Sequence, residues 1–465
     1  MMDDSLRGKH VIVMGFARQG RALARWLPSI GARVTVTDRR DKAAFGDVLA
    51  PYRQAGVRFV LGEHPPELLD DADLLCVSGG VPLTAPLVQE AVRRGIPVSN
   101  DAQLFLERCS APVIGITGSA GKTTTTTLVG EMCRADGRVT YVGGNIGDVL
   151  LDVLPQITPA DTVVMELSSF QLELMTISPH CGAILNITPN HLDRHGTMDA
   201  YTAAKARLIR FQGPDDVAIL GLDDPGSAAL QEVVPGRVFG FSARTQPPDG
   251  AYLDGERVML IGGASPDGVP CPVVTREAIP LRGDHNVLNV LAACAIAGAV
   301  GVSVEAMRRA VTTFTGVPHR LEVVRVVDGV MWVNDSIATA PERVIAAVRS
   351  YTEPLVLLLG GRDKKLPWEP LIALAVQKAR AVVTFGEHGT AISAMLRAAL
   401  ANAEDGRLDI SRLRTVDTLE EAVQVAAELA RPGDVVLLSP GGTSYDAYTD
   451  FEERGAHFRA LVADL

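Results

Sequence analysis

The sequence predicts an α/β protein of about three domains, each built on a largely parallel β-sheet. The chain has 465 residues, which is too many for one ordinary hydrophobic core. Short apolar segments that end in glycine or polar residues recur along the chain, and helical patterns separate them. This alternation is typical of β-α-β units, whose parallel strands bind ligands at their carboxyl ends.

The first block begins with an apolar segment over 10–14, a turn at Gly15 and a helical start at Gly20. A second apolar segment ends at Asp38, so the block imitates the first β-α-β unit of a dinucleotide-binding domain. The glycines do not complete the pattern G-x-G-x-x-G. The residues alone therefore favour an ordinary α/β domain with tightly packed glycines over an NAD site.

The composition narrows the classes of function. The net charge of −11 argues against broad electrostatic binding to nucleic acid or anionic lipid, although a locally basic pocket can still bind a small anion. The six cysteines include no C-x-x-C pair, which favours reduced thiols in a cytoplasmic protein over a sulfur-ligated metal. No apolar run reaches about 18 residues and no signal-peptide core opens the chain, so we expect neither a membrane span nor secretion.

The segment VIGITGSAGKTT has the chemistry of a phosphate-binding loop. Gly118 and Gly121 allow backbone N–H groups to converge on phosphate oxygens, and the following helix adds its N-terminal dipole. Lys122 would place a cation at the β- and γ-phosphates, and the Thr123 hydroxyl would hold Mg²⁺. Ile116 occupies the first glycine position of G-x-x-x-x-G-K-[ST], so a plain glycine turn with a capping threonine remains the alternative. The strand before the loop and the helix after it favour a nucleotide site.

Polar residues farther along extend this chemistry to a metal. Glu166 ends an apolar segment and could reach the same ion, although it fits an ordinary strand-end charge as well. His191 follows another apolar segment and could face the same sheet edge, although a single histidine is commonly structural. Lys205 lies in a helical pattern, which by itself predicts a solvated lysine.

The third block repeats the arrangement of polar residues after apolar segments. Asp335 and Lys364 each follow one such segment and could complete a nucleotide site between domains. Ordinary turn chemistry at strand ends is an equal alternative for both residues.

Several motifs together resemble the Mur ligases, the ATP-dependent amino-acid-adding enzymes of peptidoglycan synthesis. The motifs are ITGSAGKTT, GGNIG, ELSSFQLE, NITPNHLDRHG, AAKARL, DHNVLN, GVPHRLE, NDSIAT and LLSPGGTSYDAYTDFEERG. They stand in family order over nearly the whole chain, and ELSSFQLE with GGNIG resembles the glutamate-adding members. The resemblance implies a UDP-sugar-binding Rossmann-like domain over 1–109, a central P-loop ATPase domain over 110–317 and a C-terminal Rossmann-like glutamate-binding domain over 318–465. The implied reaction joins glutamate, with D-glutamate favoured, to the alanyl carboxylate of UDP-N-acetylmuramoyl-L-alanine through an acyl phosphate.

The resemblance also implies roles for individual residues. The implied ATP contacts are Gly118, Ser119, Ala120, Gly121, Lys122, Thr123, Thr124, Asn286, Arg320 and Asp335. The implied substrate contacts are Arg18, Gln19, Asp38 and Arg39 for the uridine diphosphate, Asn145 for the UDP-sugar substrate, and Lys364, Ser444 and Phe451 for glutamate. The implied ligands of two Mg²⁺ ions are Thr123, Glu166, His191 and a carbamylated Lys205, and the implied catalytic residues are Lys122, His191 and Lys205.

The implied role of Lys205 reverses the prediction from the helical pattern. Carbamylation requires a lysine that is neutral enough to attack CO₂, and burial near a cationic group lowers the pKa of a lysine in that direction.

The chain departs from the family motifs at four places. Ala120 replaces an asparagine in the phosphate loop, SGG replaces SPG at 78–80, and Asn190 replaces an aspartate before the metal histidine. The fourth departure is Ile337, which turns the common DSKAT into DSIAT and removes a lysine that would attract the glutamate side chain. The L-glutamate-adding variant of the ligase therefore remains an alternative. Arg343 or Lys365 could supply the missing charge.

The sequence gives weaker support to three other classes of protein. A folylpolyglutamate synthase-like ligase also joins glutamate to a carboxylate, but ELSSFQLE and the UDP-like first domain argue against it. A P-loop switch protein or a P-loop kinase would share the loop alone. We expect a cytoplasmic monomer whose partners are ATP, Mg²⁺, the UDP-sugar and glutamate, with no nucleic acid or membrane partner.

Overall fold

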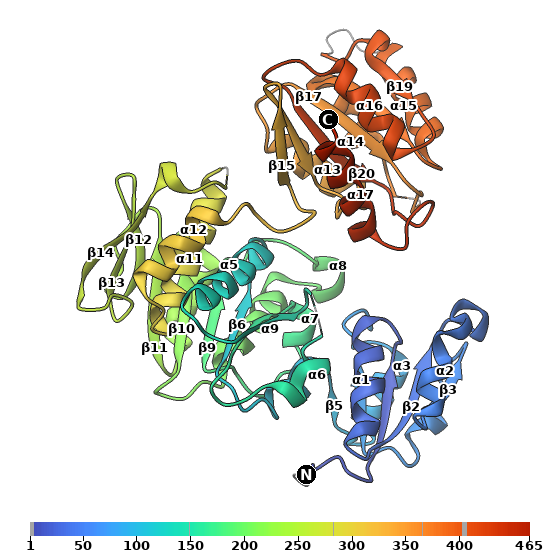
Figure 1. The fold of residues 1–465 in the computed structure, drawn as a ribbon. Helices are drawn as coiled ribbons and strands as arrows, with labels where there is room; N and C mark the ends of the chain where they lie inside the picture. The colour runs from blue at the N-terminus through green and yellow to red at the C-terminus, as the bar shows by residue number, and fades with distance from the viewer. Residues whose placement is uncertain (1–3, 148, 282, 365, 402–406) are drawn as a thin grey trace. The chain divides into compact units, whose positions relative to one another are not determined.

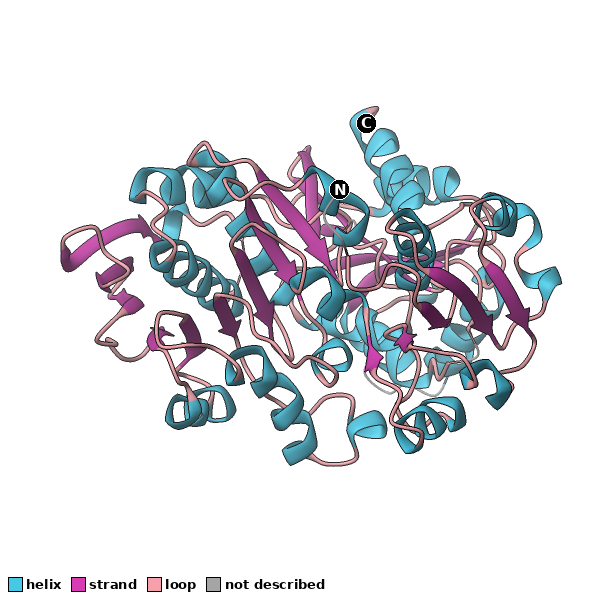
Figure 2. Cartoon of the chain, turned by 90° about the horizontal axis from the view of Figure 1, so that it is seen from below, coloured by secondary structure: helices cyan, strands magenta, loops and turns pink. Residues whose placement is uncertain are grey.

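The computed structural model describes residues 4–147, 149–281, 283–364, 366–401 and 407–465 (Figure 1). The chain divides into two compact units, Met1–Phe314 and Thr315–Leu465. Within the described residues, the strands form two sheets in the first unit and one in the second. The predicted α/β class is confirmed, because most neighbouring strands are parallel and helices connect them (Figure 2).

The N-terminal sheet of the first unit is parallel, with the strand order β3-β2-β1-β4-β5. Its strands are β1 (His10–Met14), β2 (Arg33–Asp38), β3 (Arg58–Leu61), β4 (Leu74–Val77) and β5 (Val98–Ser99). Its helices are α1 (Arg18–Ser29), α2 (Ala50–Gln54), α3 (Pro86–Arg93) and α4 (Asp101–Leu106). Every residue of β1 is buried, as expected for a central parallel strand that is covered on both faces.

The central sheet has the order β14-β13-β12-β11-β10-β9-β6-β8-β7. Its strands are β6 (Val113–Thr117), β7 (Thr140–Gly144), β8 (Thr162–Glu166), β9 (Cys181–Ile184), β10 (Val217–Gly221), β11 (Arg237–Ser242), β12 (Gly250–Asp254), β13 (Arg257–Gly262) and β14 (Gly268–Thr275). The pairing is parallel from β7 to β12 and antiparallel from β12 to β14. Because β6 and β8 are parallel neighbours, their carboxyl ends, Thr117 and Glu166, lie at the same edge of the sheet.

Helices pack against this sheet and bring distant segments to its edge. They are α5 (Lys122–Ala135), α6 (Leu150–Val153), α7 (Ser169–Leu172), α8 (Leu192–His195), α9 (Met198–Arg210), α10 (Pro225–Ala228), α11 (Asp284–Ala299) and α12 (Val304–Thr313). Helices α5, α11 and α12 lie side by side, and α9 packs against β6 and β9 (Figure 1). Among the described residues, no helix is both long and apolar enough to cross a membrane.

The second unit has the strand order β15-β16-β20-β17-β18-β19, which is antiparallel only between β15 and β16. Its strands are β15 (Glu322–Val327), β16 (Val330–Asn334), β17 (Leu355–Gly360), β18 (Ala379–Phe385), β19 (Leu413–Thr415) and β20 (Val435–Gly441). Its helices are α13 (Pro341–Arg349), α14 (Glu369–Lys378), α15 (Gly389–Ala401), α16 (Leu419–Leu429) and α17 (Phe451–Ala463).

Alternate residues of β17 enter two hydrophobic clusters. Leu357 and Leu359 belong to one cluster, and Val356 and Leu358 belong to the other. Because side chains alternate across a strand, the sheet is buried on both faces and its polar groups collect at the strand ends.

Candidate functional site

The predicted phosphate loop joins β6 to the N-terminus of α5. Gly121 precedes the helix with a φ of 82°, a left-handed conformation that glycine adopts without strain. Gly121, as the N-cap, has no side chain to cap the helix, and no other described side chain does so, which leaves its first N–H groups able to bind an anion. Lys122 begins the helix, and its Nζ donates to the carbonyl of Gly118 at 2.7 Å.

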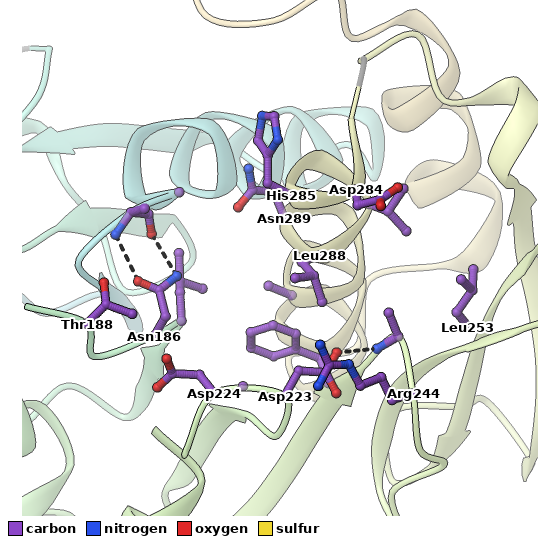
Figure 3. Close-up of a pocket in the computed structure, with 18 of the residues that line it drawn as sticks. Asn186, Thr188, Asp223, Asp224, Arg244, Leu253, Asp284, His285, Leu288 and Asn289 are labelled. Carbon is purple, nitrogen blue, oxygen red and sulfur yellow. Dashed lines mark hydrogen bonds between the residues drawn. The ribbon is translucent and has the colours of Figure 1, made fainter. Parts of the chain in front are cut away.

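The segment after β9 holds this loop in place. The backbone N–H of Ala120 donates to Asn186 Oδ1 at 2.9 Å, and Asn186 Nδ2 donates to the Ala120 carbonyl at 3.2 Å (Figure 3). The Ser119 N–H donates to the Asn186 carbonyl, and the Ser119 hydroxyl donates to the Thr188 carbonyl at 2.9 Å. The N–H groups of Ser119 and Ala120 are thus used within the protein, which leaves the first turn of α5, including Thr124, to face a phosphate. The motif did not reveal the role of Asn186.

A carboxylate stands at the start of α5, as the sequence predicted. Glu166 ends β8 and is buried. Its Oε2 accepts a hydrogen bond from the Thr123 hydroxyl at 2.8 Å, and its Oε1 accepts one from Asn145 Nδ2 at 2.8 Å. Two neutral donors therefore orient the carboxylate without neutralising its charge.

This pair of oxygens fits a Mg²⁺ site. Among the described residues, no group of three or more His, Cys, Asp or Glu side chains is placed to hold a metal. Mg²⁺ does not require such a group, because it keeps several waters and takes one or two protein oxygens together with substrate phosphates. Thr123 and Glu166, beside a phosphate loop, are a donor set of that kind.

The helical pattern predicted a solvated side chain for Lys205, and this prediction is wrong, because Lys205 is only 1% exposed. It lies on α9 where the helix packs against β6, and its Nζ donates to Thr117 Oγ1 at 3.2 Å. The ammonium also lies 4.8 Å from the ring centroid of Tyr201. Burial, aided by the charge of Lys122, lowers the pKa of Lys205 well below its usual value, while Glu166 opposes the shift. A lysine in this environment is neutral far more readily than one in water.

The two histidines after β9 have different surroundings. His191 is exposed, has a φ of 53° at the start of α8, and makes an edge-to-face contact with Phe170 at 5.1 Å between ring centroids. His195 stacks on Phe170, and its two ring nitrogens lie 2.9 Å from Glu173 Oε1 and from Ser169 Oγ. His195 thus has the contacts of a structural residue, whereas His191 is accessible to a ligand.

A cavity of about 540 Å³ opens beside the phosphate loop (Figure 3). Apolar side chains such as Phe241 and Leu288 line it together with polar side chains. The remaining lining residues include Ala120, Gly121, Asn186, Thr188, Asp223, Asp224, Arg244, Asp284, His285 and Asn289. Asn286, a predicted ATP contact, accepts a hydrogen bond from the lining residue Asn289 at 3.0 Å. A largely apolar cavity with a few polar groups next to a phosphate loop has the form of a nucleoside pocket.

A second hollow of about 260 Å³ contains several of the predicted UDP-sugar contacts. It is lined by Ala17, Arg18, Gln19, Ser78, Gly79, Gly80, Asn145, Ser168 and Phe170. Arg18 donates to the carbonyls of Gly144 and Gly147, and Gln19 Oε1 accepts from the Gly79 N–H at 2.9 Å. Asn145 therefore lines this hollow and also touches Glu166, which connects the hollow to the candidate metal site.

The predicted uridine diphosphate contacts Asp38 and Arg39 lie at and directly after the end of β2. Asp38 forms a two-pronged ion pair with Arg40 and accepts the Phe16 N–H. Although burial opposes the shift, these bonds lower the pKa of Asp38 to about 2. Arg39 is exposed beside this pair. Arg40, which the motif did not single out, orients the carboxylate.

The remaining predicted residues lie in the second unit. Asp335 is buried after β16, and its carboxylate accepts from the Ser439 hydroxyl at 2.7 Å and the Leu321 N–H at 3.3 Å. Burial raises the pKa of Asp335 to about 7 against the lowering effects of these bonds and of nearby arginines. The exposed Arg320 directly precedes Leu321.

Two of the three predicted glutamate contacts, Lys364 and Phe451, bond to the segment after β16. Lys364 Nζ donates to Thr339 Oγ1 at 3.1 Å, and Ser444 is buried after β20. The carbonyl of Phe451, at the start of α17, accepts from the Ser336 hydroxyl at 2.8 Å. Lys365, one candidate for the charge missing at Ile337, lies outside the described residues.

Comparisons with known proteins identify the family of the chain. Three family models match the chain: the Mur ligase MurD-like N-terminal domain over 9–100, the Mur ligase middle domain over 116–297, and the Mur ligase glutamate ligase domain over 319–442. The UDP-N-acetylmuramoylalanine--D-glutamate ligase of Symbiobacterium thermophilum is 43% identical, over 97% of each chain. The protein of the same name from Pelotomaculum thermopropionicum is 41% identical, over 100% of this chain and 99% of the relative.

Solved structures share the fold at lower identity. The UDP-N-acetylmuramate-alanine ligase from Thermotoga maritima matches with a TM-score of 0.57 and 19% identity, over 98% of this chain and 99% of its own. MurF from Acinetobacter baumannii matches with a TM-score of 0.55 and 20% identity, over 100% of this chain and 92% of its own. With relatives above 40% identity along the full length, the chain belongs to the Mur ligase family.

Proposed function

We propose that this protein is an ATP-dependent ligase that joins D-glutamate to the alanyl carboxylate of UDP-N-acetylmuramoyl-L-alanine during the synthesis of peptidoglycan precursors. The observation that carries the proposal is the double contact of Asn145, which lines the hollow near Arg18 and also donates to Glu166 beside the phosphate loop. A UDP-sugar substrate in the hollow would thereby have its carboxylate near the γ-phosphate of ATP. The names of the relatives support D-glutamate as the amino acid.

The proposed chemistry follows from the charges. Lys122 and the N-terminus of α5 offset the repulsion between the attacking carboxylate and the γ-phosphate, so that an acyl phosphate forms and ADP leaves. The amine of glutamate then attacks the acyl carbon, and phosphate leaves as the amide bond forms. Thr123 and Glu166 would hold Mg²⁺, and His191 is the proposed ligand of a second ion. When bound, the metal supplies further stabilisation of phosphate charge.

Lys205 is the proposed site of carbamylation. Its neutral Nζ would attack the carbon of CO₂, form an N–C bond and release one proton to water, which leaves an anionic carbamate. The support is its burial between Thr117 and Tyr201 and its lowered pKa. Such a carbamate would turn a buried cation beside Glu166 into a second metal-binding anion.

The isoleucine at position 337 favours one alternative amino-acid substrate, L-glutamate. Its aliphatic side chain cannot attract the glutamate side chain as a lysine would, and an L-glutamate-adding enzyme is the corresponding alternative. The family membership and the first-unit hollow favour either ligase over a P-loop switch or a kinase. We also propose that the enzyme acts as a monomer in the cytoplasm, where ATP and UDP-sugars are made.

A phosphate-release assay tests the function. The protein is incubated with UDP-N-acetylmuramoyl-L-alanine, ATP and Mg²⁺, with D-glutamate, L-glutamate or no amino acid. We expect phosphate release that requires D-glutamate and the UDP-sugar, and its loss in Lys122→Ala. Release only with L-glutamate would replace the substrate, and release with neither enantiomer would refute the ligase. ADP formed without free phosphate would indicate a kinase.

A further inference from the structure

Three basic side chains gather around the segment 336–339 of the second unit. Arg343, in the first turn of α13, donates from Nη1 to the carbonyl of Ile337 at 3.3 Å. Lys364, after β17, donates to Thr339 Oγ1 at 3.1 Å. Arg454, on α17, donates from Nε to the Ser336 hydroxyl at 3.0 Å and from Nη2 to the Ser336 carbonyl at 2.9 Å.

None of the three cations has an ion-pair partner among the described residues. Arg454 is 0% exposed, and all its bonds go to the neutral oxygens of Ser336 and Gly442. A buried guanidinium without a carboxylate is costly, and here it sits in a chain of net charge −11. Burial, together with the charges of Arg343 and Arg454, lowers the pKa of Lys364, as expected where positive charge is concentrated.

Neighbouring acids offset this positive charge only in part: Asp446 raises the pKa of Arg454 against the larger effect of burial, but it forms no ion pair with Arg454 among the described residues. Asp335 is enclosed by Ser439 and Leu321, and burial raises its pKa to about 7, which reduces its negative charge near neutral pH. Arg343 and Lys364 are exposed, whereas Arg454 is enclosed. The two exposed cations are therefore accessible to an anion from outside, and Arg454 adds positive potential behind them.

Glutamate carries two carboxylates, which matches two accessible cations. We propose that Arg343 binds the side-chain carboxylate of the incoming glutamate, in place of a lysine at position 337, while Lys364 binds the other carboxylate. The inference rests on the proposed function and adds a specificity-determining residue to it. The guanidinium already lies against the Ile337 backbone, and its planar fork can donate two parallel hydrogen bonds to a carboxylate.

Steady-state kinetics of Arg343→Ala and Arg343→Lys test this assignment, with Arg349→Ala as the matched control. Arg349 is an exposed arginine at the other end of the same helix. In Arg343→Ala, we expect the KM for glutamate to rise about 10- to 100-fold, since a charge-assisted hydrogen bond contributes on that order. The KM for ATP should stay within about twofold, and Arg343→Lys should lie between the alanine variant and the wild type.

Glutamine provides a readout that a purely structural role would not change. The wild-type enzyme should prefer glutamate over glutamine in kcat/KM, and Arg343→Ala should lose most of that preference, while Arg349→Ala keeps it. Adding Ile337→Lys to Arg343→Ala should restore the preference, because the second cation returns from the neighbouring position.

The possible outcomes separate the inference from the function on which it rests. A wild-type enzyme that releases phosphate, together with an alanine variant that keeps its KM for glutamate and its preference over glutamine, would overturn the role of Arg343 alone. A fall in kcat and in melting temperature without a change in that preference would also overturn it. A wild-type protein that is inactive with both enantiomers would refute the ligase itself.

Discussion

Two lysines, Lys205 beside the phosphate loop of the first unit and Lys364 at a strand end of the second unit, have opposite surroundings. Lys205 is enclosed by Thr117 and Tyr201 beside a carboxylate that is already oriented by two donors. Lys364 is exposed and bonds to the hydroxyl of Thr339. The first arrangement is preorganised, and preorganised charges stabilise a transition state without reorganisation during the reaction. In the second arrangement, the positive charge would be balanced only when a ligand with two negative charges binds.

Replacing Lys205 is the strongest challenge to the preorganised centre. In Lys205→Arg the cation remains but cannot form a carbamate, so we expect kcat to fall by about 10²–10³-fold or more, as for loss of a group that positions catalytic charge. Phosphate release measures the loss. A ¹³C NMR signal of a carbamate after incubation with labelled bicarbonate should be present in the wild type and absent in the variant.

Arg210→Ala is the control for this prediction, since Arg210 is exposed at the end of the same helix. It should keep wild-type kcat and the carbamate signal. If Lys205→Arg kept both activity and melting temperature, carbamylation would have no part in the reaction.

Asp335 gives the second unit a stability that depends on pH. Its folded pKa of about 7 lies above its usual value of 3.8, so the folded state binds more protons than the unfolded state between these values. The free energy of unfolding therefore falls as pH rises through this window and levels off above it. From pH 5 to pH 8 the loss is about 3 kcal/mol, and Asp335→Asn should remove it.

Tryptophan fluorescence can isolate this unit. The chain contains three tryptophans, and only Trp26 lies in the first unit, so a Trp26→Phe background leaves Trp332 and Trp368 as reporters of the second. Urea unfolding of this background with and without Asp335→Asn is measured at both pH values. Equal pH dependence in the two proteins would show that Asp335 titrates normally.

The contrast between the units also explains which features the sequence could predict. The strand over 10–14 and the position of Glu166 at a strand end were predicted correctly, because continuous apolar segments and the glycine or polar residues that end them are local signals. The burial of Lys205 was not predicted from its pattern, because it arises from packing of α9 on β6, a contact between distant segments. The family motif supplied what the local pattern lacked.

Two hydrogen-bond partners were also missed, one because it bonds to a distant segment and the other because its direction depends on the fold of a turn. Asn186 holds the loop at Ala120 across 66 positions of the chain, and no periodicity indicates such a bond. Arg40 neighbours the predicted Asp38, but only the fold of the turn after β2 directs its guanidinium back to the carboxylate. The catalytic, ATP-binding, metal-binding and substrate-binding roles assigned to the candidate residues all remain predictions.

The smallest effect that we predict concerns how rigidly the phosphate loop is held. In Asn186→Ala the Ala120 N–H and carbonyl lose their side-chain partners, and each bond contributes about 0.5–1.5 kcal/mol. Because water can reach Ala120, which is exposed, part of that loss is recovered, and we expect ATP affinity to fall only about three- to tenfold. Calorimetric titration with ATP and Mg²⁺ measures the change. Gln231→Ala removes an exposed amide that caps a local carbonyl away from the cavity, and it should leave the affinity unchanged. If Asn186→Ala bound ATP as tightly as the wild type, Gly121 and the helix alone would be sufficient to fix the shape of the loop. The segment after β9 would then contribute little to the preorganisation of the first unit.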